Sequence, residues 1–185
     1  IDSFFDASHG KYKKLIIDLR NNLGGAPAYW QDIFIKRLID KPLKHEQYSI
    51  VKKEVFNKLN FNRRLFNYKY RKEIDLGKLT LLEPSEWPFD SIPEYLNPDE
   101  FYFVKNTQTY TPTNKFPFDG EIYLLTDHNT FSAAEDFSKA SKELDFATLV
   151  GANTIGGAAV SFAPWLFELP NSHILMNIEI DMAFN

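Results

Sequence analysis

Ser132 stands where a polar turn meets the start of a helical pattern. The stretch TDHNTFSAAEDF, from Thr126 to Phe137, follows an apolar run at Ile122 to Leu125. Hydrolases often place a nucleophile at a strand-to-helix turn, because the turn exposes the hydroxyl and the first helical N–H groups can stabilise an oxyanion. The glycines of a G-x-S-x-G elbow are absent, so this stretch by itself supports more than one interpretation.

The structural alternative is that Ser132 simply begins a helix. Ser132 and Glu135 match the S/T-x-x-E capping box, in which each side chain takes up an otherwise unpaired backbone N–H. The apolar residues that follow have helical spacing and predict one buried stripe: Ala133, Phe137, Ala140 and Leu144. Local chemistry therefore leaves cap and nucleophile both open.

A first glycine-rich turn lies near the amino end of the chain. Leu15 to Leu19 is a short apolar run typical of a buried strand, and it ends at RNNLGG with Gly24 and Gly25. Pro27 suits the first turn of the helix expected next. That helix should carry four apolar side chains inward: Trp30, Ile33, Phe34 and Leu38.

A second glycine-rich turn, GANTIGG, follows a third short strand at Ala147 to Val150. In a mostly parallel α/β sheet the carboxyl ends of the strands share one edge, where ligands bind. We therefore expect the three strands to be neighbours and their turns to gather around one crevice. Neither G-x-G-x-x-G nor G-x-x-x-x-G-K-[ST] is present, so nucleotide binding is unsupported.

Three motifs together resemble the carboxyl-terminal processing (tail-specific) serine proteases. LIIDLRNNLGG, IYLLTDHNTFSAAEDFSKA and ATLVGANTIGG occur in the order of that family, whose relatives include the tricorn protease core and interphotoreceptor retinoid-binding protein. The resemblance extends from Leu15 to the carboxyl terminus, except for Lys41 to Phe118. It implies an α/β fold of the Clp-protease/crotonase kind.

The resemblance also assigns roles within these motifs. The serine three residues before the glutamate is the family nucleophile, which here is Ser132. The backbone N–H groups of Ala133 and of Gly24 or Gly25 would form the oxyanion hole. Asp18 and Arg20 belong to the first motif and are expected to fix its turn.

One position departs from the processing proteases. Their general-base lysine ends a V-G-x-x-T-x-G-K stretch, and in VGANTIGG that position is Gly157. This favours the tricorn-like branch, which uses an upstream histidine supported by a later glutamate. His9 lies at the end of a helix in the family pattern, and His128 is expected to be a surface turn residue. The base is therefore expected outside residues 1–185, and this chain alone should be a poor peptidase.

Two other histidines, His45 and His173, have no partner that the sequence identifies. His45 falls in the region between the motifs, and His173 falls in a predicted hairpin around Pro170. The four histidines are too scattered to indicate a zinc site. We expect neither a metal nor a cofactor.

Residues 41–118 separate the first two motif units. Val51 to Lys72 has helical spacing and many basic residues, and the proline-rich stretch that follows predicts irregular chain or short strands. Such a passage is typical of an insertion or a cap over a site. We therefore expect residues 1–185 to be the carboxyl-terminal core of a peptidase-like domain with a variable insertion at about 41–118.

Composition sets limits on the partners. The 185 residues carry a net charge of −4, which argues against non-specific nucleic-acid binding. No cysteine is present, which excludes disulfides and thiol catalysis, and no apolar run has the length of a membrane span. No signal peptide is seen, and the resemblance favours an extracytoplasmic or secreted location.

The function predicted from these observations is hydrolysis of peptide bonds through an acyl-enzyme on Ser132, with peptides or unfolded proteins as substrates. The alternative is a non-catalytic binding module of the same fold for a peptide or an apolar ligand, since the retinoid-binding relatives share the motifs. A crotonase-like acyl-CoA enzyme fits the fold but not the serine motif.

Overall fold

The computed structural model describes residues 2–8, 10–61, 79–90, 92, 96–114, 117–157, 165–178 and 181–184. The chain divides into two compact units. The first unit consists of Ile1–His45 and Gln108–Ala159, and the second consists of Glu46–Thr107 and Val160–Asn185. The first unit holds all three motifs.

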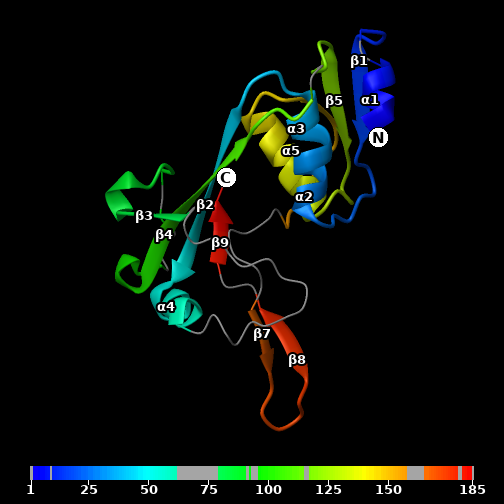
Figure 1. The fold of residues 1–185 in the computed structure, drawn as a ribbon. Helices are drawn as coiled ribbons and strands as arrows, with labels where there is room; N and C mark the ends of the chain where they lie inside the picture. Colours follow the sequence, from blue (N-terminus) through cyan, green and yellow to red (C-terminus); the bar gives the residue numbers. More distant parts are fainter. Residues whose placement is uncertain are drawn as a thin grey trace. The chain divides into compact units, whose positions relative to one another are not determined.

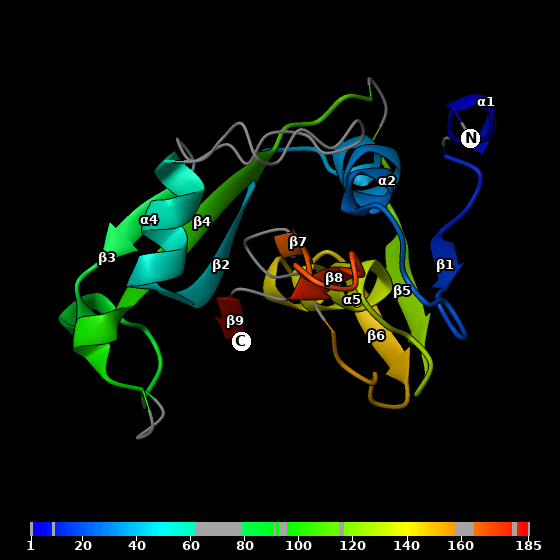
Figure 2. The same ribbon diagram turned by 90° about the horizontal axis from the view of Figure 1, so that it is seen from below.

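A three-stranded parallel sheet organises the first unit (Figure 2). Its strands, in the order β1-β5-β6, are β1 (Lys14–Asp18), β5 (Glu121–Thr126) and β6 (Thr148–Gly151). β1 pairs with β5 and β5 with β6 in parallel register. The predicted adjacency of the three strands and the common direction of their carboxyl ends are confirmed.

One helix of this unit precedes β1, and the others follow β1 and β5 in sequence (Figure 1). The amino-terminal helix is α1 (Asp2–Ser8), and the helix after β5 is α5 (Ala133–Glu143). The helix expected from Pro27 is present as three joined pieces: α2 (Pro27–Trp30), the π-helical turn η1 (Gln31–Ile35) and α3 (Lys36–Leu38). The sequence pattern did not predict the π turn.

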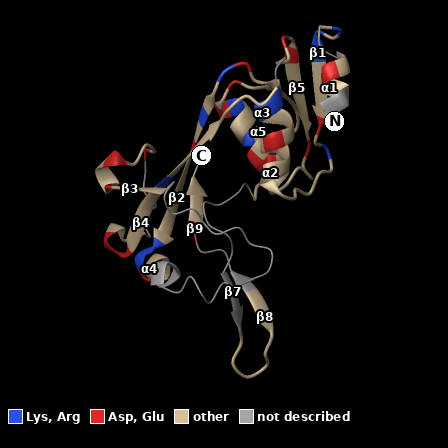
Figure 3. Cartoon of the chain, viewed as in Figure 1, with Lys and Arg blue, Asp and Glu red and all other residues tan. Residues whose placement is uncertain are grey.

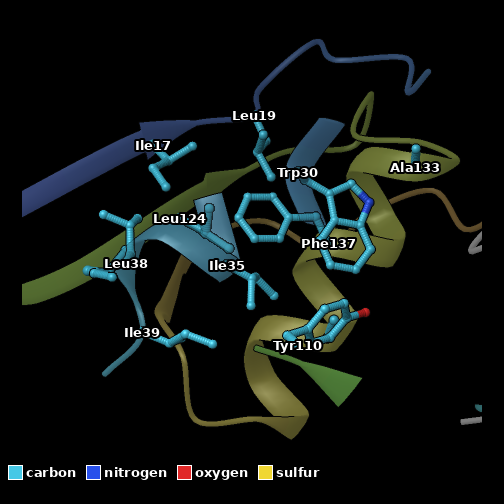
Figure 4. Packing of buried hydrophobic residues seen from close by; sticks show 12 residues of the cluster. Ile17, Leu19, Trp30, Ile35, Leu38, Ile39, Tyr110, Leu124, Ala133 and Phe137 are labelled. Atoms are coloured by element: carbon cyan, nitrogen blue, oxygen red, sulfur yellow. The ribbon is translucent and has the colours of Figure 1, made fainter. Parts of the chain in front are cut away.

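The core of the first unit lies between this sheet and its helices. Trp30 stacks on Phe137 with ring centroids 5.3 Å apart, and Phe34 stacks on the same ring at 5.7 Å (Figure 4). Burial of Ala133, Phe137 and Ala140 confirms the apolar stripe predicted for α5. Stacked rings of this kind add to the stability gained from burying their area.

The second unit is built mainly on an antiparallel pattern. Its four-stranded sheet, in the order β3-β4-β2-β9, contains β2 (Leu43–Lys52), β3 (Leu79–Leu82), β4 (Phe101–Tyr110) and β9 (Asp181–Phe184). Its other elements are α4 (Lys53–Phe61), the short 3-10 turns Pro84–Glu86 and Pro98–Glu100, and a hairpin of β7 (Trp165–Glu168) and β8 (Leu175–Ile178).

Predictions for this region had mixed outcomes. The hairpin around Pro170 is confirmed, and the proline-rich stretch forms 3-10 turns and irregular chain. Helical structure predicted from Val51 to Lys72 is present as α4, and residues 62–78 lie outside the described residues. The ten-residue strands β2 and β4 were not predicted. The interpretation of residues 41–118 as an insertion stays a proposal.

Charged residues of both signs lie on the helices of the first unit (Figure 3). The charged residues of α5 are Glu135, Asp136, Lys139, Lys142 and Glu143. Among the described residues, no helix has the length and apolar character needed to cross a membrane.

Candidate active site

Ser132 has an unusual backbone conformation at the start of α5. Its φ is 53° and its ψ is −125°, a region that residues with a side chain seldom adopt. It occupies the N-cap position, but its hydroxyl makes no capping hydrogen bond. The predicted capping box is therefore wrong: Glu135 accepts a hydrogen bond from the Gly156 N–H at 2.9 Å instead of reaching back to Ser132. A strained residue persists where its surroundings hold it, and the contacts of this turn show how.

The first glycine-rich turn packs directly against the serine turn. The Phe131 N–H donates to the Asn22 carbonyl at 3.0 Å. Gly24 has a φ of +95°, and a Cβ added to it would lie 2.6 Å from the Ser132 Cβ and 2.9 Å from the Ala133 nitrogen. Glycine is required at residue 24 both for its backbone angle and for this close approach.

Asp127 links the same two turns through one carboxylate. Its Oδ1 accepts hydrogen bonds from the Asn21 N–H at 3.0 Å, the Asn129 N–H at 3.0 Å and the Thr130 hydroxyl at 3.2 Å. The Asn129 side-chain amide also donates to the Asn21 side-chain carbonyl at 2.8 Å. The Asn21 N–H, followed by the other donors, lowers the pKa of Asp127 below its usual value.

The second glycine-rich turn closes the other side of Ser132. The Ser132 N–H points at the Gly156 carbonyl at 3.4 Å, and Phe131 forms a parallel bridge with Gly156. Gly157 has a φ of +73°, and a Cβ added there would overlap the ring of Phe131. A lysine at residue 157 would therefore need this turn to change shape.

Two backbone N–H groups, one in the first glycine-rich turn and one at the start of α5, have no recorded partner among the described residues. Gly24 donates its N–H to the Asn22 side-chain oxygen at 2.9 Å. Within the described residues, no hydrogen bond is recorded for the N–H of Gly25 or of Ala133, the first residue of α5. Unpaired donors of this kind, at a helix amino terminus, are suited to a developing negative charge.

Asp18 and Arg20 pair with each other at the end of β1. The Arg20 guanidinium donates to the Asp18 carboxylate at 2.9 and 2.7 Å, and the Arg20 N–H donates to it at 3.0 Å. These bonds lower the pKa of Asp18 to about 2. This geometry agrees with the structural role expected for the pair in the first motif.

Within the part of the chain that the structure describes, no general base contacts the serine hydroxyl. Among the described residues, no side chain is recorded in a hydrogen bond with Ser132 Oγ. His128 lies exposed in the turn between β5 and α5, His173 lies in the β7–β8 turn, and His9 lies outside the described residues. No cluster of three His, Asp or Glu side chains in the described part of the chain could hold a metal ion.

His45 has the partners that the sequence could not identify. Its side chain is 1% exposed, its Nε2 lies 2.9 Å from Glu143 Oε2, and its Nδ1 lies 3.3 Å from the Tyr110 hydroxyl. These partners come from α5 and β4, far apart in sequence. Both ring nitrogens are therefore engaged at the carboxyl end of α5.

An open pocket of about 360 Å³ adjoins the serine turn. Its walls include Gly24 and Gly25 from the first turn, Ala134 from α5, and the aromatic rings of Trp30 and Phe34. Sequence analysis missed this pocket, because helical spacing shows only that such rings face inward. It also missed Asp127, although aspartate followed by polar residues is a usual signal for a side chain that binds nearby backbone N–H groups.

Comparison with known proteins places this chain in a family. Residues 2–182 match the family described as Peptidase family S41. Mature CPAF in complex with lactacystin is similar in structure, with a TM-score of 0.61 and 19% identity over 98% of this chain and 38% of that one. A protein from Parabacteroides merdae, described as a candidate peptidase, has a TM-score of 0.58 and 18% identity over 98% of this chain and 42% of that one.

This chain thus spans about two fifths of the length of these two proteins. At 19% and 18% identity, the structural likeness to these proteins shows a shared fold and no more. The family assignment rests instead on the match over residues 2–182. The mixed α/β architecture agrees with the fold expected from the three motifs. The chain belongs to peptidase family S41.

Proposed function

We propose that this chain carries the nucleophile and oxyanion hole of a serine peptidase, with Ser132 attacking the peptide carbonyl. The observation that supports this most directly is the strained Ser132, which Gly24 and Gly156 contact from two sides while its hydroxyl has no recorded partner in the described residues. A residue used only as a helix cap would make a capping bond and would not need a positive φ.

The reaction would proceed by acyl transfer. The Ser132 Oγ would bond to the carbonyl carbon as its proton passes to a base, and the resulting oxyanion would accept hydrogen bonds from the N–H groups of Ala133 and Gly25. The peptide C–N bond would then break, the amine would leave with the proton from the base, and water would hydrolyse the acyl-enzyme. Gly24 would shape this hole by its missing side chain rather than by donating, since Asn22 already accepts its N–H. Loss of one oxyanion donor typically lowers kcat by roughly 10²–10³-fold.

A general base must take the proton of the Ser132 hydroxyl. The position where the processing proteases have that base is not a lysine in this chain. Gly157 occupies the position of the lysine, and no histidine of the described part contacts the hydroxyl. We therefore propose that the base belongs to a region that the longer relatives possess and this chain does not span. Without it, attack by a hydroxyl is slow. This would place the protein in the tricorn-like branch, with peptides or unfolded proteins as substrates and an extracytoplasmic or secreted location.

Labelling with a serine-directed fluorophosphonate tests the proposal. The 185-residue chain should label slowly, and Ser132→Ala should abolish the adduct. Ser172→Ala, which removes an exposed serine from the β7–β8 turn, should leave labelling unchanged. Equal labelling of the parent chain and Ser132→Ala would contradict the assignment, and the binding-module alternative would then take its place.

A further inference from the structure

The wall of the pocket beside Ser132 includes a buried polar group that the described residues leave without a partner. Trp30 is only 4% exposed, and its indole nitrogen has no hydrogen-bond partner among the described residues. The indole lines the pocket, with its nitrogen on the side of the ring facing Ala133 (Figure 4). A buried N–H without a partner is unfavourable, so a ligand that brings an acceptor gains from entering.

The rest of the pocket is mainly apolar, with Asn22 as its other polar side chain among the described residues. Its walls include the rings of Tyr29, Phe34 and Phe137 and the methyl group of Ala134, and none of the described residues that line it is charged. An ionised side chain placed there would lose its hydration without gaining a counter-charge. The volume of about 360 Å³ is at the lower end for sites that bind small molecules, and it has room for one large side chain.

The position of the pocket relates it to the proposed oxyanion hole. Gly25 and Ala133, whose N–H groups would hold the oxyanion, also line the pocket. A substrate carbonyl at those donors therefore places the side chain of the same residue at the pocket entrance. This step rests on the proposed function, because it takes Ser132 as the group that attacks that carbonyl.

We propose that the pocket selects a large, mainly apolar side chain with a hydrogen-bond acceptor, such as tyrosine, at the residue whose carbonyl is attacked. The aromatic walls contact its apolar length, and the Trp30 indole N–H donates to its oxygen. A site that hydrogen-bonds a substrate hydroxyl discriminates against the analogue lacking it, because its own polar group is then left unpaired. Trp30 is thus a specificity-determining residue rather than a catalytic one.

The test uses this chain and needs no catalytic turnover. N-acetyl amides of tyrosine, phenylalanine, alanine and aspartate are titrated into the ¹⁵N-labelled protein, and the Trp30 indole N–H signal, assigned with Trp30→Phe, is followed. The tyrosine amide should shift this signal and bind most tightly, ahead of phenylalanine by about three- to tenfold. Alanine should be weaker, and aspartate should not bind. Trp30→Phe should remove the preference for tyrosine over phenylalanine.

Ala134→Leu fills the pocket and should weaken binding of the tyrosine amide by about tenfold or more. Ala28→Leu makes the same change at an exposed position of α2 that does not line the pocket, and it should have no effect. The proposal is overturned if the Trp30 signal does not move up to the solubility limit of the amides. It is also overturned if alanine binds as well as tyrosine, or if Ala134→Leu changes nothing.

Fluorophosphonate labelling separates failure of this inference from failure of the proposed function. Selective amide binding without any Ser132 adduct would leave the pocket assignment in place and remove the peptidase assignment. If a Ser132 adduct forms but the amides bind equally whatever their side chain, the peptidase assignment would stand and the pocket assignment would be removed.

Discussion

The two ends of helix α5 differ in how completely their polar groups are paired. At the amino end, Ser132 has a positive φ and an unpartnered hydroxyl, and the Ala133 N–H is unused within the described residues. At the carboxyl end, Glu143 pairs with His45 at 2.9 Å and with Lys139 at 3.9 Å. An acidic residue is unfavourable at a helix carboxyl terminus, and these partners offset that effect.

The two groups that pair near the carboxyl end, His45 and Tyr110, are buried. His45 bridges Glu143 and Tyr110, and burial, followed by the charges of Asp136 and Glu143, raises the pKa of Tyr110. The phenol therefore keeps its proton and can donate to His45. This is the pattern of a structural network, in which each group stabilises the next.

The position of His45 on this helix excludes it as the general base for Ser132. His45 is the most buried of the described histidines, but it lies at the far end of an eleven-residue helix. Such a helix is about 16 Å long. A general base must lie within hydrogen-bond reach of the hydroxyl. His45 is therefore assigned to stability, and unpaired donors mark the end of the helix where chemistry is proposed.

Substituting Gly24 should have the largest effect on the reactive end. Gly24→Ala would place a Cβ against Ser132 and the Phe131 carbonyl, so we expect at least a hundredfold loss of fluorophosphonate labelling, about the effect of losing one oxyanion donor. Gly10→Ala is the matched control, because Gly10 also has a positive φ but open space around it. It should cost about 1 kcal/mol of unfolding free energy and leave labelling intact. Equal labelling rates for both variants would show that the contact between the turns is not needed.

Substitution of His45 should lower the stability of the protein without changing the reactivity of Ser132. His45→Ala leaves Glu143 and the Tyr110 hydroxyl without their partner, so the free energy of unfolding should fall by about 2–4 kcal/mol. Labelling per folded molecule should stay the same. His128→Ala, at an exposed turn position, should change stability by less than about 0.5 kcal/mol. Loss of labelling in folded His45→Ala would contradict the claim that His45 contributes to stability and not to the reactivity of Ser132.

Substitution of Asp127 should have the smallest effect of the three changes, confined to the two turns that its carboxylate links. Asp127→Ala removes the acceptor that ties Asn21 to Asn129, and amide hydrogen exchange at these two residues should become about tenfold faster, as expected for loss of one hydrogen bond. Asp119→Ala, in an exposed ion pair with Lys13, should leave both rates unchanged. The measurement is residue-resolved hydrogen exchange by NMR.

The acid dependence of Asp127 has a defined direction. Its pKa is lowered in the folded protein, so its contribution is complete above the unfolded pKa of about 4 and is lost as pH falls through the folded value. Protection of the Asn21 and Asn129 amides should therefore decrease on acidification below about pH 4. Protection that is unchanged in Asp127→Ala would mean that other bonds hold the turns together.

Much of the first unit could be predicted from the sequence because its signals are local. Short apolar runs ending at glycines predicted β1, β5 and β6, and helical spacing predicted the buried face of α5. The long strands β2 and β4 escaped prediction because polar residues interrupt their apolar pattern, as in LKHEQYSIVK.

The arrangement around Ser132 depended on contacts between distant residues. The capping box failed because Gly156, 21 residues after Glu135, supplies the N–H that this carboxylate accepts. The His45 network and the Trp30 pocket likewise join elements from different parts of the chain. Motif order located the serine, but only the structure shows which neighbouring donors are already in use.

The most direct test of the central claim is to trap the acyl-enzyme on Ser132. A form of the protein extended to the length of its relatives is mixed with a peptide ester of tyrosine and quenched in acid, and intact mass spectrometry with peptide mapping locates the adduct. We predict a mass increase equal to the acyl group on the peptide containing Ser132, and none in Ser132→Ala. An acyl group on another residue, or turnover of the ester by Ser132→Ala at the parent rate, would contradict the account.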